Sequence, residues 1–250
     1  MTLLAALFGL TALLYASVGF GGGSTYNALL ALWGVDYRIL PAIALLANII
    51  VVVGGTIRFH RAGLVPWRRL WPILILSAPL AWAGGRTPIS ESAFTGLLGL
   101  SLAAAGLLLL FQPERQDDLP ETQSRILTPL IGAGVGFLSG LVGIGGGIFL
   151  SPIMHLVGWA RAKRIAASAS VFILVNSIAG LVGQLMKLGD PGRAQALEGY
   201  WLLAIAVLVG GQIGSHVGIR LLPASLVRRV TALLILYVAA RLIGQWLHLF

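Results

Sequence analysis

Cysteine is absent from this 250-residue chain, and charged side chains make up only 10% of it. The lack of cysteine excludes disulfides, thiolate metal sites and thiol catalysis. Soluble domains carry about 25% charged residues, so the shortage of charge indicates an integral membrane protein, as do the 58% of hydrophobic residues and the mean hydropathy of +0.93. The first residues contain neither a basic segment nor a small-residue cleavage site, so we expect a first membrane segment there and not a signal peptide.

Acidic side chains are also scarce, and none of the eight lies inside an apolar span. The sequence therefore predicts neither a carboxylate proton relay nor a carboxylate-ligated metal site. It contains no nucleophile triad, no HExxH and no P-loop, so we expect no catalytic residues, no metal and no cofactor, and hence no enzyme. The net charge of +9 comes from basic residues between apolar spans, which indicates contact with anionic membrane lipid and not with nucleic acid.

Apolar segments of helical length fill both halves of the chain. The polar linker 112–125 separates a first transmembrane repeat, residues 1–111, from a second, residues 126–250. The expected segments are Leu3–Val18, Thr25–Trp33, Ile39–Ile57, Leu70–Gly85 and Ser92–Phe111, then Ile126–Val142, Ile148–Gly158, Ile165–Met186, Gly199–Ile219 and Leu226–Leu249. We therefore predict an all-α, polytopic membrane protein in the cell (inner or plasma) membrane.

Glycine is concentrated in two clusters that interrupt these segments. The first glycine cluster is Gly19–Gly23 (GFGGG) and the second is Gly143–Gly147 (GIGGG), 124 residues later. Glycine costs about 1 kcal/mol against alanine in a helix interior, so each cluster should break its helix. Broken backbone at membrane depth is tolerated only where protein buries it or where it lines a wet cavity. We expect the rest of the chain to hold the two clusters face to face.

Further positions repeat between the halves. Asn48 and Asn176 each lie in the middle of a span, and each is followed seven residues later by a glycine, Gly55 and Gly183. Together with the glycine clusters, these positions indicate an internal duplication.

The loop charges distinguish two orientations of the repeats. If each cluster lets its helix continue across the membrane, the Lys and Arg residues other than Arg241 divide 8 to 8. If each cluster reverses the chain, they divide 12 to 4. The twelve that then share one side are Arg58, Arg61, Arg68, Arg69, Arg115, Arg125, Arg161, Lys163, Arg164, Arg220, Arg228 and Arg229. Cytoplasmic loops are enriched in Lys and Arg, so the second arrangement is favoured: two inverted repeats, each with a re-entrant hairpin and three transmembrane helices, and with both termini outside.

A reversing cluster has a chemical use. Transporters built of inverted repeats bind substrate near the midplane, where interrupted helices point their termini at it. Unpaired N–H groups and the positive end of the helix dipole can hold an anion there without a cationic side chain. An isolated glycine more often serves close helix packing, but two symmetric clusters favour a site. The predicted substrate-binding residues are Gly21, Gly22, Gly23, Ser24, Thr25, Asn48, Gly145, Gly146, Gly147, Ser151, Asn176 and Gln212.

Two histidines are candidates for proton transfer or ion coupling. His216 follows Gln212 by one helical turn, and His155 follows Ser151 by one turn. A hydrogen-bonded structural role is the alternative for both.

The chain resembles the TauE/SafE family of sulfite and organosulfur-anion exporters. The residues that carry the resemblance are both glycine clusters, Pro152 in GGGIFLSPIMHLVGW, the small-residue segment Ala166–Ser170, and Gly210 and Gly211 with Gly218 and Arg220. The first half departs from the pattern, because Ala28 stands where the second half has Pro152. The resemblance implies a secondary transporter, most simply an exporter, of small anions such as sulfite, sulfonates or related carboxylates.

Electrostatics also favour export. A membrane potential that is negative inside drives anion exit by about 2.3 kcal/mol per charge per 100 mV, so export needs no coupling ion. Uptake would need one, supplied through the histidines or a Na⁺ site. The alternatives are a small-anion channel, an ion-coupled uptake carrier for a related carboxylate or sulfonate, a membrane-embedded enzyme and a scaffold subunit. A homodimer is one expected assembly.

Overall fold

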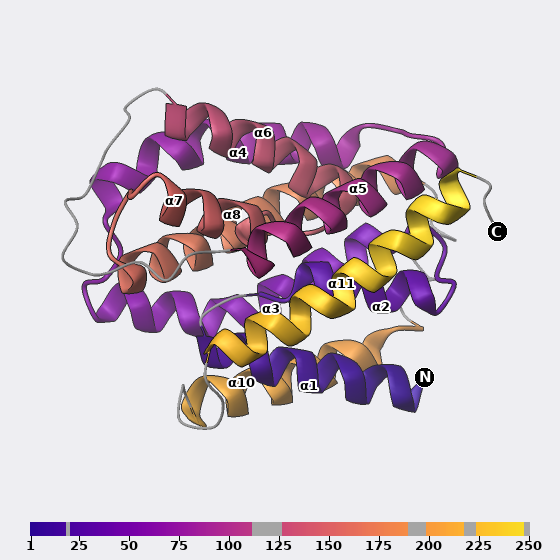
Figure 1. Cartoon of the computed structure of the whole chain (residues 1–250), viewed down its shortest axis with the longest axis horizontal. Coiled ribbons are helices and arrows are strands. Elements are labelled where there is room, and N and C mark those ends of the chain that lie inside the picture. Colours follow the sequence, from indigo (N-terminus) through magenta and orange to yellow (C-terminus); the bar gives the residue numbers. More distant parts are fainter. Residues whose placement is uncertain (19–20, 112–126, 190–198, 218–223, 248–250) are drawn as a thin grey trace.

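A computed structural model describes residues 1–18, 21–111, 127–189, 199–217 and 224–247. The described residues form ten α-helices and no strand (Figure 1), which confirms the predicted all-α class. The helices are α1 (Thr2–Val18), α2 (Gly23–Leu32), α3 (Leu40–Arg61), α4 (Trp67–Arg86), α5 (Glu91–Leu110), α6 (Leu127–Val142), α7 (Gly147–Leu156), α8 (Ala162–Leu188), α10 (Trp201–Val217) and α11 (Ala224–Trp246).

Helix length separates two kinds of element. Four described segments are long and apolar enough to cross a bilayer: α3, α5, α8 and the Arg229–Trp246 part of α11. In contrast, α2 and α7 have 10 residues each. At 1.5 Å per residue each is about 15 Å long, half of a hydrocarbon core that is about 30 Å thick. These are the dimensions of a polytopic membrane protein that contains two half-length helices.

Glycines allow α4 and α6 to touch along their backbones. Gly132 of α6 lies against Ile73 of α4, and Gly140 lies against Ala81. Residue numbers rise together on both helices, so α4 and α6 run parallel. The same kind of contact joins α1 to α10, where Gly210 approaches the backbone of Gly9. Each of these pairs joins one helix from each half of the chain.

We predict opposite effects for two alanine substitutions on α6. A Cβ at Gly140 would overlap the carbonyl oxygen of Ala81, whereas a Cβ at Gly134 would meet nothing within 4 Å. Gly140→Ala should therefore destabilise the protein by about 1–3 kcal/mol through overpacking. Gly134→Ala should stabilise it by up to about 1 kcal/mol through helix propensity. Thermal unfolding in detergent measures both, and equal midpoints for the two variants would contradict the packing described for α4 and α6.

Two other helix pairs, again with one member from each half of the chain, run antiparallel. Leu45 of α3 lies near Gly180 of α8. Farther along α3, Thr56 Oγ1 lies 2.9 Å from Ser170 Oγ of α8. Residue numbers therefore increase along α3 in the direction in which they decrease along α8. The pair α5 and α11 is antiparallel in the same way.

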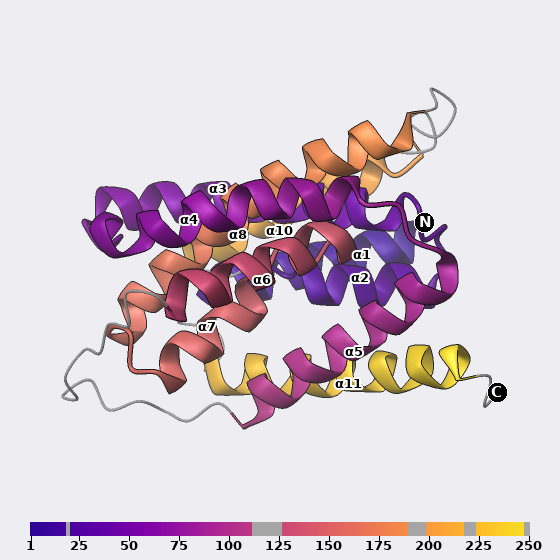
Figure 2. The ribbon, with the colours of Figure 1, turned by 90° about the horizontal axis from the view of Figure 1, so that it is seen from above.

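The two ends of the molecule differ. At one end the first turn of α4 meets the α7–α8 loop, where Arg69 Nη1 donates to the carbonyl oxygen of Trp159 at 3.1 Å. Leu70, Trp159 and Ile165 form part of an apolar core beside that contact. The start of α1 and the end of α11 both lie at the opposite end of the long axis (Figures 1 and 2).

Candidate functional site

Both half-length helices begin at a glycine cluster. Gly22 precedes α2 with φ 109°, and Gly146 precedes α7 with φ 76°, a left-handed conformation that strains any residue with a side chain. The amide of Tyr26 donates to Gly22 O at 2.9 Å, and the amide of Leu150 donates to Gly146 O at 3.1 Å. At the second cluster the amide of Phe149 also donates to Gly146 O, at 3.1 Å. The N–H groups of residues 23–25 and 147–148 precede the helical ladder. Each cluster therefore presents backbone donors and the positive end of a helix dipole.

The two clusters meet through one side chain from α3. Gly23 lies so close to Ile144 that a Cβ there would overlap the Ile144 carbonyl oxygen. The fully buried amide of Asn48 lies between the clusters, and its Nδ2 donates to that same oxygen at 3.1 Å. Asn48 Nδ2 also faces Gly145, whereas Asn48 Oδ1 faces Gly21. The structure thus places Asn48 against both glycine clusters.

The matching span, α8, packs on the second cluster. Ile173 and Ser177 both approach Gly145, and Asn176 lies on the same turn of α8. Asn176 is fully buried, and its Nδ2 donates to the carbonyl oxygen of Phe172 at 2.8 Å. The two equivalent asparagines are therefore both buried on the helices that flank the clusters, but the described hydrogen bond of Asn176 stays within its own helix.

The hydroxyl groups next to the clusters divide into two groups. Thr25 Oγ1 lies 3.0 Å from the hydroxyl of Tyr15 on α1, so it is already engaged. Ser24 and Ser151 are each 2% exposed, and their hydroxyls meet no hydrogen-bond partner among the described residues. These two hydroxyls remain available to a ligand.

Asn27 is a polar residue of this region that the sequence analysis missed. It lies one turn after Gly23 on α2 and is fully buried. Neither atom of its amide has a partner in the part of the chain that the structure describes. Aligning the two glycine clusters places Asn27 opposite Ser151, so the repeat itself contained the signal.

Other predicted residues are not gathered here. Gln212 is exposed on α10 and lies beside Gly54 of α3. His155 is partly buried near the C-terminal end of α7, away from the helix start. The side chain of His216 lies outside the described residues.

Among the residues that the structure describes, none places an ionised side chain at the site. The buried polar residues described are all Ser, Thr, Asn or Gln, and no described Asp, Glu, Lys or Arg is buried. The searched residues also contain no group of three metal-ligating side chains. Within the described part of the chain, helix dipoles and backbone N–H groups supply the positive potential at the clusters.

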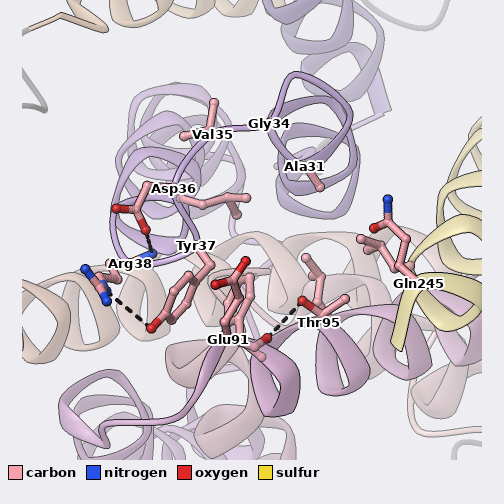
Figure 3. Close-up of a pocket in the computed structure, with 13 residues that line it drawn as sticks. Ala31, Gly34, Val35, Asp36, Tyr37, Arg38, Glu91, Thr95 and Gln245 are labelled. Atoms are coloured by element: carbon pink, nitrogen blue, oxygen red, sulfur yellow. Dashed lines mark hydrogen bonds between the residues drawn. The ribbon is translucent and has the colours of Figure 1, made fainter. Parts of the chain in front are cut away.

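A separate cavity of about 440 Å³ lies where α2, α5 and α11 approach each other (Figure 3). Its polar lining includes Asp36, Tyr37, Arg38, Glu91 and Gln245. Arg38 Nε donates to the Tyr37 hydroxyl at 3.2 Å, and this bond raises the pKa of Arg38. Two carboxylates against one guanidinium make this cavity a poor place for an anion.

Long apolar helices around buried polar residues are the features of a multi-pass membrane protein. A family model described as sulfite exporter TauE/SafE matches residues 3–242. The chain is 34% identical over 244 residues to the probable membrane transporter protein y4hK of Sinorhizobium fredii, covering 96% of this chain and 97% of the relative. The chain belongs to the TauE/SafE family, as its sequence resemblance predicted.

More distant relatives have the same kind of name. The probable membrane transporter protein MamO of Magnetospirillum gryphiswaldense is 23% identical over 248 residues, which cover 83% of this chain but only 39% of that longer protein. The probable membrane transporter protein MJ0441 of Methanocaldococcus jannaschii is 26% identical over 174 residues, covering 65% of this chain and 63% of the relative. No solved structure matches the chain significantly.

Proposed function

We propose that the protein is a secondary transporter that exports small sulfur-containing anions, such as sulfite or sulfonates. The substrate binds near the membrane midplane between the N-termini of α2 and α7. The observation that carries this proposal is the contact between the two glycine clusters, where Asn48 lies against both and donates to Ile144. Helix N-termini with free N–H groups bind oxyanions without further cationic groups.

The proposal includes two inverted repeats, in which each glycine cluster reverses the chain into a re-entrant hairpin. The antiparallel directions of α3 against α8 and of α5 against α11 support this symmetry. The half-length helices α2 and α7 lie in opposite halves of the long axis (Figures 1 and 2), as hairpins entering from opposite sides would. The end that carries Arg69 and the α7–α8 loop is then the cytoplasmic end.

The chemistry of recognition follows from the groups present. The anionic oxygens accept from the first N–H groups of α2 and α7, and the hydroxyls of Ser24 and Ser151 add donors. Because one half-length helix opens toward each side, rearrangement of either hairpin exposes the same central site to one side at a time. The membrane potential then drives the anion outward.

Sulfite efflux from proteoliposomes tests the proposal. We expect saturable efflux that competes with sulfonates and accelerates when the interior is made negative with a potassium gradient and valinomycin. Protein-free liposomes give the baseline. Large unitary currents would indicate a channel instead, and flux that requires a proton or Na⁺ gradient would indicate ion-coupled uptake. Absence of any anion flux from a correctly folded preparation would refute the transport assignment.

A further inference from the structure

Three buried amide side chains near the glycine clusters each point their nitrogen at a backbone carbonyl oxygen. Asn48, Asn176 and Gln184 are all fully buried. Each donates its amide N–H to a backbone carbonyl: Asn48 to Ile144 at 3.1 Å, Asn176 to Phe172 at 2.8 Å and Gln184 to Gly140 at 2.7 Å. A carbonyl oxygen can only accept, so the nitrogen of each amide must face it. The orientation of all three amide oxygens is therefore fixed.

Those amide oxygens have no donor. Asn48 Oδ1, Asn176 Oδ1 and Gln184 Oε1 are buried and meet no hydrogen-bond partner among the residues that the structure describes. Buried polar atoms are nearly always satisfied, so a group of buried acceptors without partners among the described residues indicates a functional role. A ligand that carries an O–H or N–H group supplies what they lack.

Two of the three residues with unsatisfied acceptors lie beside the glycine clusters. Asn48 Oδ1 faces Gly21 of the first cluster. Asn176 lies on the face of α8 whose Ile173 and Ser177 contact Gly145 of the second cluster. Gln184 is farther along α8 and binds the end of α6, so we assign it a supporting role only. Donors for an anion and acceptors for a ligand proton therefore come from neighbouring residues.

The charge available at the site is limited. Each helix N-terminus is equivalent to about half a positive charge, so α2 and α7 together supply about one. No described Lys or Arg is buried to add more. A monoanion is matched by this potential, whereas a dianion would keep about one uncompensated negative charge in a region from which water is excluded.

Building on the proposed function, we infer that the site selects a monoanion that carries at least one hydrogen-bond donor. The anionic oxygens lie at the starts of α2 and α7, and the ligand donor faces the amide oxygens of Asn48 and Asn176. For an acid that can lose two protons, the bound species is the singly protonated ion. Sulfite is then carried as HSO₃⁻ and not as SO₃²⁻.

Three probe anions test separately the requirement for a single negative charge and the requirement for a hydrogen-bond donor. Ethanesulfonate is a monoanion without a donor, 2-hydroxyethanesulfonate adds one hydroxyl, and sulfate is a dianion. Their affinities for the purified full-length protein are measured by competition against labelled 2-hydroxyethanesulfonate. We expect 2-hydroxyethanesulfonate to bind at least about tenfold tighter than ethanesulfonate, the ratio that one buried hydrogen bond supplies, and sulfate to compete least.

Asn176→Leu tests whether Asn176 causes the preference for 2-hydroxyethanesulfonate over ethanesulfonate. Asn176→Leu removes the acceptor and sacrifices only a hydrogen bond within α8, so it should bring the ratio of the two sulfonate affinities close to one while ethanesulfonate still binds. The matched control is Ser168→Ala on the same helix, where the buried hydroxyl donates to Arg164 O, and this variant should keep the wild-type ratio.

The outcomes distinguish failure of the selectivity inference from failure of the proposed transport function. Equal affinities for the two sulfonates in the wild type, or tighter binding of sulfate, would overturn the inference and leave anion transport standing. An unchanged ratio in a folded Asn176→Leu protein would overturn the role given to Asn176. If none of the three anions binds, the proposed function itself fails. The wild-type comparison decides the matter even if the variant does not fold.

Discussion

Gly23→Val should reduce anion efflux at least about a hundredfold. A Cβ at Gly23 would overlap both the Ile144 carbonyl oxygen and Asn48 Nδ2. The asparagine can turn away, but the backbone oxygen cannot move without displacing the second glycine cluster. The start of α2 is then shifted from its binding position, and misplacement of about 1 Å is enough for an effect of this size. Efflux from proteoliposomes measures it.

The control is the same substitution at an unobstructed glycine. Gly134 is exposed on α6, and nothing lies within 4 Å of an added Cβ. Gly134→Val should therefore keep wild-type efflux. Thermal unfolding of both variants separates lost function from lost folding, because overpacking at Gly23 is expected to cost only about 1–3 kcal/mol. Equal efflux from the two valine variants would show that contact between the clusters is irrelevant to transport.

Asn48→Asp is the second substitution for which we expect a large effect. It keeps the shape of the side chain but replaces the N–H donor by an oxygen that opposes the Ile144 carbonyl oxygen now 3.1 Å from Asn48 Nδ2. It also places a negative charge where the anion binds, in a region without buried cationic side chains among the described residues. Anion affinity should fall at least about a hundredfold, since unpaired buried charge and like-charge repulsion act together.

Asn48→Leu provides the comparison for that charge. It removes the donor and leaves Ile144 O unsatisfied, at a cost of about 1–3 kcal/mol, but it adds no charge. Competition binding at neutral pH should therefore order the affinities as wild type, then Asn48→Leu, then Asn48→Asp. An aspartate variant that binds anions as tightly as the leucine variant would exclude an anion next to residue 48.

The positions of the helices could be predicted closely from the sequence because apolar length and glycine breaks determine them. Their polar ends could not be predicted as well. Helix α8 begins at Ala162 and not at the predicted Ile165, and α4 begins at Trp67 and not at Leu70. In both cases basic residues form the first turn of the helix. Hydropathy detects where a segment leaves the apolar core, but a helix continues into the polar interface beyond that point.

The sequence indicated which segments contain the candidate site, but not which face of each helix points toward it. The structure places Asn48 against both clusters, whereas Gln212 is exposed on its helix. Which side of α10 faces inward depends on its packing against α1 and α3, and the nearly uniform apolar sequence of α10 does not encode that choice. For the same reason the sequence does not distinguish Gly140, where an added Cβ would overlap Ala81, from Gly134, where an added Cβ would meet nothing within 4 Å.

The backbone contacts of α4 with α6 and of α1 with α10 bear on what holds the molecule together. Each contact interlocks one helix from the first half of the chain with one from the second, at glycines that leave no room for lipid between them. The two halves therefore form one shared core, and neither half forms a separate core of its own. Cohesion of the halves then depends on these crossings and not on the covalent connection, so a chain severed between α5 and α6 remains a single assembly.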